Sequence, residues 1–132
     1  MNHLKGRVIK QLVDFFDQDY RRITHALDVL YHAQRSMESH PDADAEVVIA
    51  AALLHDVGIK PSEAELGYNN GPTQEKYGPP VAQKLLSAIG FPDDKTRRVC
   101  EIVGNHHSRS RYDYVELEIL KEADRIANRA NQ

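Results

Sequence analysis

The spacing of apolar residues follows the period of an α-helix along almost the whole chain. In the first such segment, Leu4, Val8, Leu12 and Phe15 recur every three or four positions. Six segments carry this period: residues 3–16, 19–38, 43–57, 79–89, 93–106 and 114–130. None shows the strict alternation of apolar and polar residues that is typical of a β-strand. The pattern predicts an all-α domain of about six helices.

The third segment, residues 43–57, contains the run EVVIAAALLHDV and is apolar on every side. A helix of this kind is buried all round, so we expect it at the centre of the domain. Asp42 or Asp44 is suited to cap its N-terminus, and Gly58 its C-terminus. Pro61 is expected to stop any continuation of the helix.

Glycine, asparagine and proline residues cluster in the next part of the chain. Residues 59–72 are therefore predicted to form a loop, and Thr73 to cap a short helical turn. The run Gly78-Pro79-Pro80 predicts a break, with a new helix beginning at Pro79.

Length and composition fit one globular domain, covering residues 1–132. The chain has 132 residues, of which 41% are apolar and 28% charged, enough for a core and a polar surface. Its formal net charge of -3 gives no electrostatic case for general nucleic-acid binding. Cys100 is the one cysteine, and no apolar run is long enough for a membrane span, so we expect a cytoplasmic protein.

Several polar residues fall on or beside apolar helix faces. His55 and Asp56 close the most apolar helix, His25 lies at the edge of an apolar arc, and Asp124 continues the apolar face of the last helix. His106 lies on an apolar stripe as well, with His107 pointing away from it. Burial of such groups is unfavourable unless something pairs with them.

One metal ion would account for His25, His55, Asp56 and Asp124 together. Two imidazoles and two carboxylates form a mixed nitrogen and oxygen shell suited to Mn, Fe, Co, Ni or Zn. Taken singly, each residue has an ordinary structural explanation, such as a hydrogen-bonded histidine or a salt bridge. The argument for a metal rests on the joint pattern.

The order His, then His-Asp, then Asp resembles the HD-domain superfamily of metal-dependent phosphohydrolases. The motifs that carry the resemblance are ITHALDVLYHA, AALLHDVGI and LEILKEADRIAN, together with GPPVA and IVGNHHS. The resemblance implies an all-α bundle around a metal held by His25, His55, Asp56 and Asp124.

The resemblance also bears on the number of metals. HD proteins with two metals supply further histidines between the His-Asp pair and the last Asp. His106 or His107 matches one of these, but the other position holds Tyr77, with Glu75 nearby. We therefore expect one divalent metal, and keep Glu75 and Tyr77 as candidates near a second. A GYP signature is absent after His107, which argues against a cyclic-dinucleotide phosphodiesterase.

The function that the resemblance implies is hydrolysis of a phosphate ester, of a nucleotide or another small phosphometabolite, by attack of metal-bound water. Asp56 is expected to orient the water, and His106 to bind phosphate or protonate the leaving oxygen. The candidates for substrate contacts are Lys60, His106, His107, Arg109 and Arg111. Lys60 is also a candidate for a catalytic role. The alternative for Lys60, Arg109 and Arg111 is that each is an ordinary solvent-exposed charge with no role in substrate binding.

Two other functions remain open on the sequence. One is a di-iron oxygenase on the same scaffold, and the other is a non-catalytic metal-binding HD module in signalling. The expected partner is a small phosphorylated substrate, without a membrane. A homodimer packed through the apolar face of residues 3–16 also stays open.

Overall fold

The computed structural model describes residues 3–130, which contain seven α-helices and no strand. They are α1 (Leu4–Phe16), α2 (Tyr20–Met37), α3 (Ala45–Leu54), α4 (Ile59–Leu66), α5 (Gly71–Ala88), α6 (Asp93–Val103) and α7 (Val115–Ala130). The all-α class predicted from the periodicity is confirmed, with one helix more than expected. None of the helices in this range is long and apolar enough to cross a membrane.

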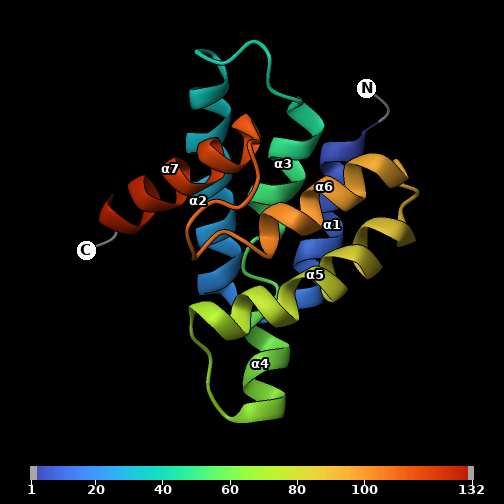
Figure 1. Ribbon diagram of the computed structural model, residues 1–132. Helices are drawn as coiled ribbons and strands as arrows, with labels where there is room; N and C mark the ends of the chain where they lie inside the picture. The colour runs from blue at the N-terminus through green and yellow to red at the C-terminus, as the bar shows by residue number, and fades with distance from the viewer. Residues whose placement is uncertain (1–2, 131–132) are drawn as a thin grey trace.

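Helix α3 lies at the centre of the bundle, with α1, α2, α6 and α7 packed against it (Figure 1). Every side chain from Val47 to Leu54 is buried, as its all-round apolar sequence predicts. Asp44 caps the helix, because its carboxylate accepts hydrogen bonds from the backbone N–H groups of Glu46 and Val47 at 3.0 and 3.2 Å. The helix ends at Leu54, so His55 and Asp56 lie in the turn that follows.

Four of the other helices form two packed pairs, α2 with α7 and α5 with α6 (Figure 1). Helix α1 covers α3 with the face formed by Leu4, Val8, Leu12 and Phe16, all of which are buried. This face belongs to the chain's own core, so it is not available for the dimer contact considered from the sequence.

Helix α4 lies where the sequence predicted a loop. It starts after Gly58 and ends at Gly67, whose φ of 80° is the left-handed conformation common at helix C-termini. Pro61 is compatible with it because the third residue of a helix has no intrahelical partner for its N–H group. The prediction that residues 59–72 form a loop was therefore wrong for residues 59–66.

Helix α5 begins earlier than predicted and continues through Pro79 and Pro80. Asn70 caps it, and the side chain of Thr73 bonds back to the Asn70 backbone in a capping box. Each internal proline leaves a carbonyl four residues earlier without its usual donor. Tertiary packing against α4 and α6 offsets this cost, and no break occurs.

Gly58 and Gly78 allow α5 to cross very close to the turn after α3. A Cβ on Gly58 would lie 2.5 Å from the Gln74 carbonyl oxygen and 2.7 Å from the Gly78 nitrogen. A Cβ on Gly78 would lie 2.7 Å from a methyl group of Val103. The two glycines thus fix how closely the turn with His55 and Asp56 packs on α5.

This contact predicts the effect of Gly58→Ala. The methyl group meets backbone atoms that cannot rotate away, so we expect a loss of about 1–3 kcal/mol in the free energy of unfolding, measured by denaturant titration. Gly6→Ala, in the first turn of α1, is the matched control, because no atom of the described residues lies within 4 Å of an added Cβ there. It should stabilise the protein by about 0.5–1 kcal/mol. Equal effects of both changes would contradict the close crossing.

Candidate metal centre

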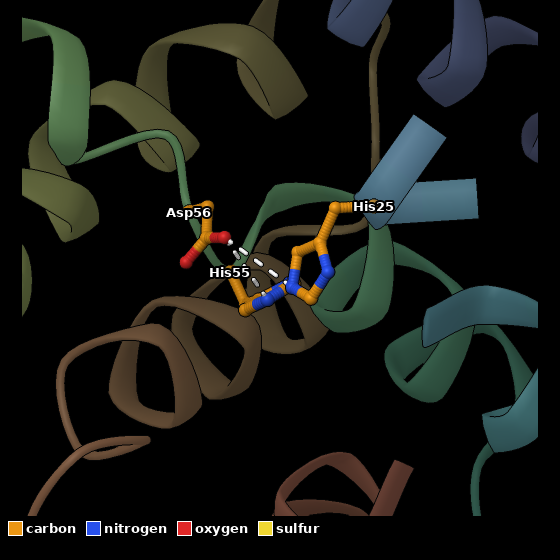
Figure 2. A group of neighbouring side chains, drawn as sticks. All are labelled: His25, His55 and Asp56. Atoms are coloured by element: carbon orange, nitrogen blue, oxygen red, sulfur yellow. Dashed lines mark ion pairs between the residues drawn. The ribbon is translucent and has the colours of Figure 1, made fainter. Parts of the chain in front are cut away.

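Four side chains from different parts of the chain meet beside the centre of the bundle. His25 comes from α2, His55 and Asp56 from the turn after α3 (Figure 2), and Asp124 from α7. His25 Nε2 lies 3.0 Å from Asp124 Oδ1 and 3.6 Å from Asp56 Oδ2. His55 Nε2 lies 3.3 Å from the same Asp124 oxygen and 3.4 Å from the same Asp56 oxygen. The ligand atoms of His25, His55 and Asp56 all lie within 4.8 Å of one another, and Asp124 Oδ1 contacts both imidazole nitrogens.

His55 is held so that its Nε2 atom faces both carboxylates. The side chain is fully buried, and its Nδ1–H donates to the Ala52 carbonyl oxygen at 2.8 Å. Nε2 has no hydrogen-bond partner among residues 3–130. A neutral imidazole would thus point a lone pair at two anionic oxygens, which only a proton or a cation between them relieves. The residues present fit a divalent metal.

His106 repeats this arrangement on the other side of Asp56. Its Nδ1–H donates to the Val103 carbonyl oxygen at 2.7 Å, and its buried Nε2 has no hydrogen-bond partner in the described part of the chain. This Nε2 lies 3.7 Å from Asp56 Oδ1, whereas Asp56 Oδ2 faces His25 and His55. Asp56 is therefore placed between two groups of nitrogen atoms.

The ionisation of these groups in the metal-free protein reflects their mutual contacts. Burial acts to lower the pKa of His55, but the Asp56 and Asp124 carboxylates outweigh it and raise this pKa to about 9. Burial acts to raise the pKa of Asp56, but His55 and His106 lower it to about 2. The pKa of Asp124 is likewise lowered, by its contacts with His25 and His55 against the effect of burial. Without a metal, a proton on His55 balances the carboxylates.

A second group of potential metal ligands consists of Asp56, His106 and His107. The ligand atoms of these residues lie within 4.8 Å of one another. His107 Nε2 donates to the Gln74 side-chain oxygen at 2.6 Å, which leaves the lone pair on Nδ1. Adjacent histidines in the loop after α6 thus supply two nitrogen donors, although no histidine lies between His55 and His106.

The loop that carries His106 and His107 is organised by Asn105, which the sequence reasoning did not single out. Asn105 is fully buried, and its amide donates to Ser108 Oγ and to the Arg109 carbonyl oxygen. Its carbonyl oxygen accepts the backbone N–H of Arg111 at 2.7 Å. An asparagine beside two histidines gives no periodic signal, so this role becomes visible only once the loop is folded.

Two residues expected near the site form hydrogen bonds within this loop instead. They are Arg111, a candidate for substrate binding, and Glu75, a candidate near a second metal. The Arg111 guanidinium donates to the Gly104 carbonyl oxygen and to Ser108 Oγ. Glu75 Oε2 accepts from the His107 backbone N–H and from Ser108 Oγ at 3.0 and 2.8 Å. Both side chains stabilise the loop, and neither meets the four-residue cluster.

Three further predicted residues make no hydrogen bond, ion pair or ring contact with the cluster in the described part of the chain. Lys60 Nζ donates to the Phe15 carbonyl oxygen at 2.9 Å and lies over the Phe15 ring, because α4 turns it towards the end of α1. The Arg109 side chain is exposed and has no polar partner among residues 3–130. The Tyr77 ring lies beside the ammonium of Lys76.

An open cleft of about 820 Å³ adjoins the cluster at His25 and Asp56. Helix α2 supplies one side of it, and Asn128 of α7 also lines it. Two arginines that the sequence reasoning missed, Arg21 and Arg22, lie in this cleft. Arg21 and Arg22 precede His25 by four and three residues, so they lie near the same face of α2 as His25. Only the folded structure shows that a cleft opens beside this face.

The all-α bundle thus carries a cluster of histidines and aspartates that could hold a metal ion. The family model described as HD domain matches residues 22–129. The chain is also similar to a crystal structure described as a predicted HD superfamily hydrolase from an uncultured Thermotogales bacterium. That similarity has 28% sequence identity and a TM-score of 0.68, and covers 94% of this chain and 67% of the other. No curated protein matches.

The chain therefore belongs to the HD domain family of metal-dependent phosphohydrolases. The resemblance stated from the sequence motifs is confirmed. The matched range begins shortly before His25 and ends after Asp124, so it spans all four residues of the cluster.

The raised pKa of His55 predicts how pH acts on the metal-free protein. The stabilising contact between protonated His55 and the two carboxylates is complete below pH 6.5 and is lost as pH rises through about 9. The free energy of unfolding of chelator-treated protein should therefore fall over this range. Metal affinity should rise over the same range, because metal and proton compete for Nε2.

Urea titrations and metal titrations at several pH values measure both trends. In His55→Gln both slopes should largely disappear, whereas the control His40→Gln should keep them. A metal-free protein that gains stability between pH 6.5 and pH 9 would contradict the proposed charge balance.

Proposed function

We propose that this protein hydrolyses phosphate esters of a nucleotide or another small phosphometabolite, using a divalent metal held by His25, His55, Asp56 and Asp124. The observation that carries the proposal is the buried, unpaired Nε2 atom of His55, which faces two carboxylate oxygens. Family membership supports the reaction class, and the cleft beside His25 and Asp56 gives a substrate access.

The chain's own residues supply the acid, base and orienting groups. When bound, a divalent metal lowers the pKa of its water and polarises a phosphoryl oxygen. Asp56 remains ionised at neutral pH, so its carboxylate can accept a hydrogen bond from the attacking water and orient it towards phosphorus. His106 Nε2 is free to donate to a phosphoryl oxygen or to the leaving oxygen when protonated.

In this proposal, an arginine that lines the cleft supplies the positive charge that stabilises the phosphoryl group. Arg21 and Arg22 line it, whereas Lys60 and Arg111 bond to backbone carbonyl oxygens elsewhere. Phosphoryl transfer depends on positioning and on compensation of charge at the phosphoryl oxygens. Arg22 is already paired with Asp19 and Glu63. We therefore assign this part to Arg21, in place of the cations expected from the sequence.

We propose one tightly bound metal, with a weaker second position at Asp56, His106 and His107. The first position has four ligands, including two carboxylates. The second has three ligands and shares Asp56 with the first. Mn, Fe, Co, Ni and Zn all suit such mixed nitrogen and oxygen ligands.

The di-iron oxygenase is a second candidate, favoured by one observation. Six potential ligands gather here, with Asp56 between two groups of nitrogen atoms, so a count of ligands does not exclude it. The arginine-lined cleft favours a phosphorylated substrate instead. Two irons per chain, with turnover that consumes oxygen and no phosphate release, would establish the oxygenase.

The hydrolase proposal predicts the effect of replacing metal ligands. In Asp124→Asn and His55→Ala, phosphate release by Mn-loaded protein from a panel of phosphomonoesters should fall about a thousandfold. The control His40→Ala, outside the site, should keep wild-type activity. Circular dichroism and bound metal per chain, measured on each variant, separate loss of metal from loss of fold. Hydrolysis that persists in both folded ligand variants would refute the proposal.

A further inference from the structure

One face of α2 carries two opposite charges along the cleft. Arg21, His25 and Asp28 all line it and follow one another at spacings of four and three residues. At a rise of 1.5 Å per residue, Arg21 lies about 6 Å along the helix axis before His25, and Asp28 about 4.5 Å after it. A molecule at His25 and Asp56 therefore has a cation on one side and an anion on the other.

Both charges are available to a ligand. Neither the Arg21 guanidinium nor the Asp28 carboxylate has a hydrogen-bond or ion-pair partner among residues 3–130. Arg22, in contrast, is 3.1 Å from Asp19 and 3.9 Å from Glu63. Asp28 is partly buried, and a carboxylate in that position gains most from a donor that approaches through the cleft.

The chemistry of the two groups differs in what it recognises. A guanidinium binds phosphoryl oxygens, often through two parallel hydrogen bonds. A carboxylate accepts hydrogen bonds from hydroxyl groups, as acidic residues do with ribose, and repels a further phosphate. Thr24 and Asn128 add neutral hydrogen-bonding groups to the same cleft. The cleft as a whole suits a ligand with one phosphoryl end and one hydroxylated end.

We propose that the cleft selects phosphomonoesters of a hydroxylated alcohol, namely sugar phosphates or nucleoside monophosphates. Arg21 binds oxygens of the phosphoryl group, and Asp28 accepts a hydrogen bond from a hydroxyl group of the alcohol part. Asp28 is thus a specificity-determining residue. The inference rests on the proposed function for the position of the phosphoryl group at His25 and Asp56.

Binding of two non-hydrolysable ligands to Mn-loaded protein tests this assignment. One is the methylene phosphonate analogue of ribose 5-phosphate, and the other is propylphosphonate, which has no hydroxyl group. Asp28→Asn keeps the shape of the side chain but removes its charge. By titration calorimetry, it should weaken binding of the ribose analogue about tenfold to a hundredfold and leave propylphosphonate within about twofold of wild type.

Arg21→Ala should weaken both ligands by similar factors, because both carry the phosphonate. The matched controls are Asp42→Asn and Arg7→Ala, exposed charges that do not line the cleft. If Asp28→Asn weakens both ligands equally, or neither, the assignment of Asp28 is wrong.

Hydrolysis measured in parallel separates this inference from the proposed function. Wild-type protein should release phosphate from ribose 5-phosphate faster than from propyl phosphate, and Asp28→Asn should remove most of that preference. Selective binding without phosphate release from any ester would overturn the proposed hydrolysis but support the binding assignment. Hydrolysis of both esters at equal rates, with equal binding of both analogues, would overturn the selectivity and leave hydrolysis standing.

Discussion

The structure depends on a buried imidazole nitrogen that faces two carboxylates. His55 Nδ1–H donates to a backbone carbonyl oxygen, so Nε2 faces Asp56 and Asp124 without a hydrogen-bond partner among residues 3–130. A proton satisfies it in the metal-free chain, and in the function proposed here a divalent cation would take the place of that proton. Either cation would compensate the negative charge of the carboxylates, so the proposed exchange would couple metal binding to stability.

The surrounding helices hold this arrangement rigid. Helix α3 is buried along its whole length and ends at the site, so its last turn cannot move without disturbing the core. The close crossing of Gly58 and Gly78 fixes the next turn against α5. Asn105 orders the loop that brings His106 to the other oxygen of Asp56. The free energy gained from apolar packing thus offsets the cost of burying the polar residues of the site.

The sequence predicts those features of the fold and the site that arise from local residue preferences or from the periodic spacing of apolar residues. The helical class and central α3 follow from apolar spacing, and the cluster of His25, His55, Asp56 and Asp124 follows from polar residues on apolar faces. The continuation of α5 through Pro79 and Pro80 was missed because it depends on tertiary contact with α4 and α6. Lys60 was misplaced because α4 had been expected to be a loop. The cleft arginines were missed because periodicity does not show which helix faces enclose a cavity.

The central claim concerns where a metal binds, and anomalous diffraction tests it most directly. Crystals grown with Mn²⁺, measured near the manganese edge, should show a strong peak bounded by His25 Nε2, His55 Nε2 and oxygens of Asp56 and Asp124. A weaker peak between Asp56 and His106 would agree with the second position. The absence of any peak at the four-residue cluster, in protein that binds manganese in solution, would contradict the account.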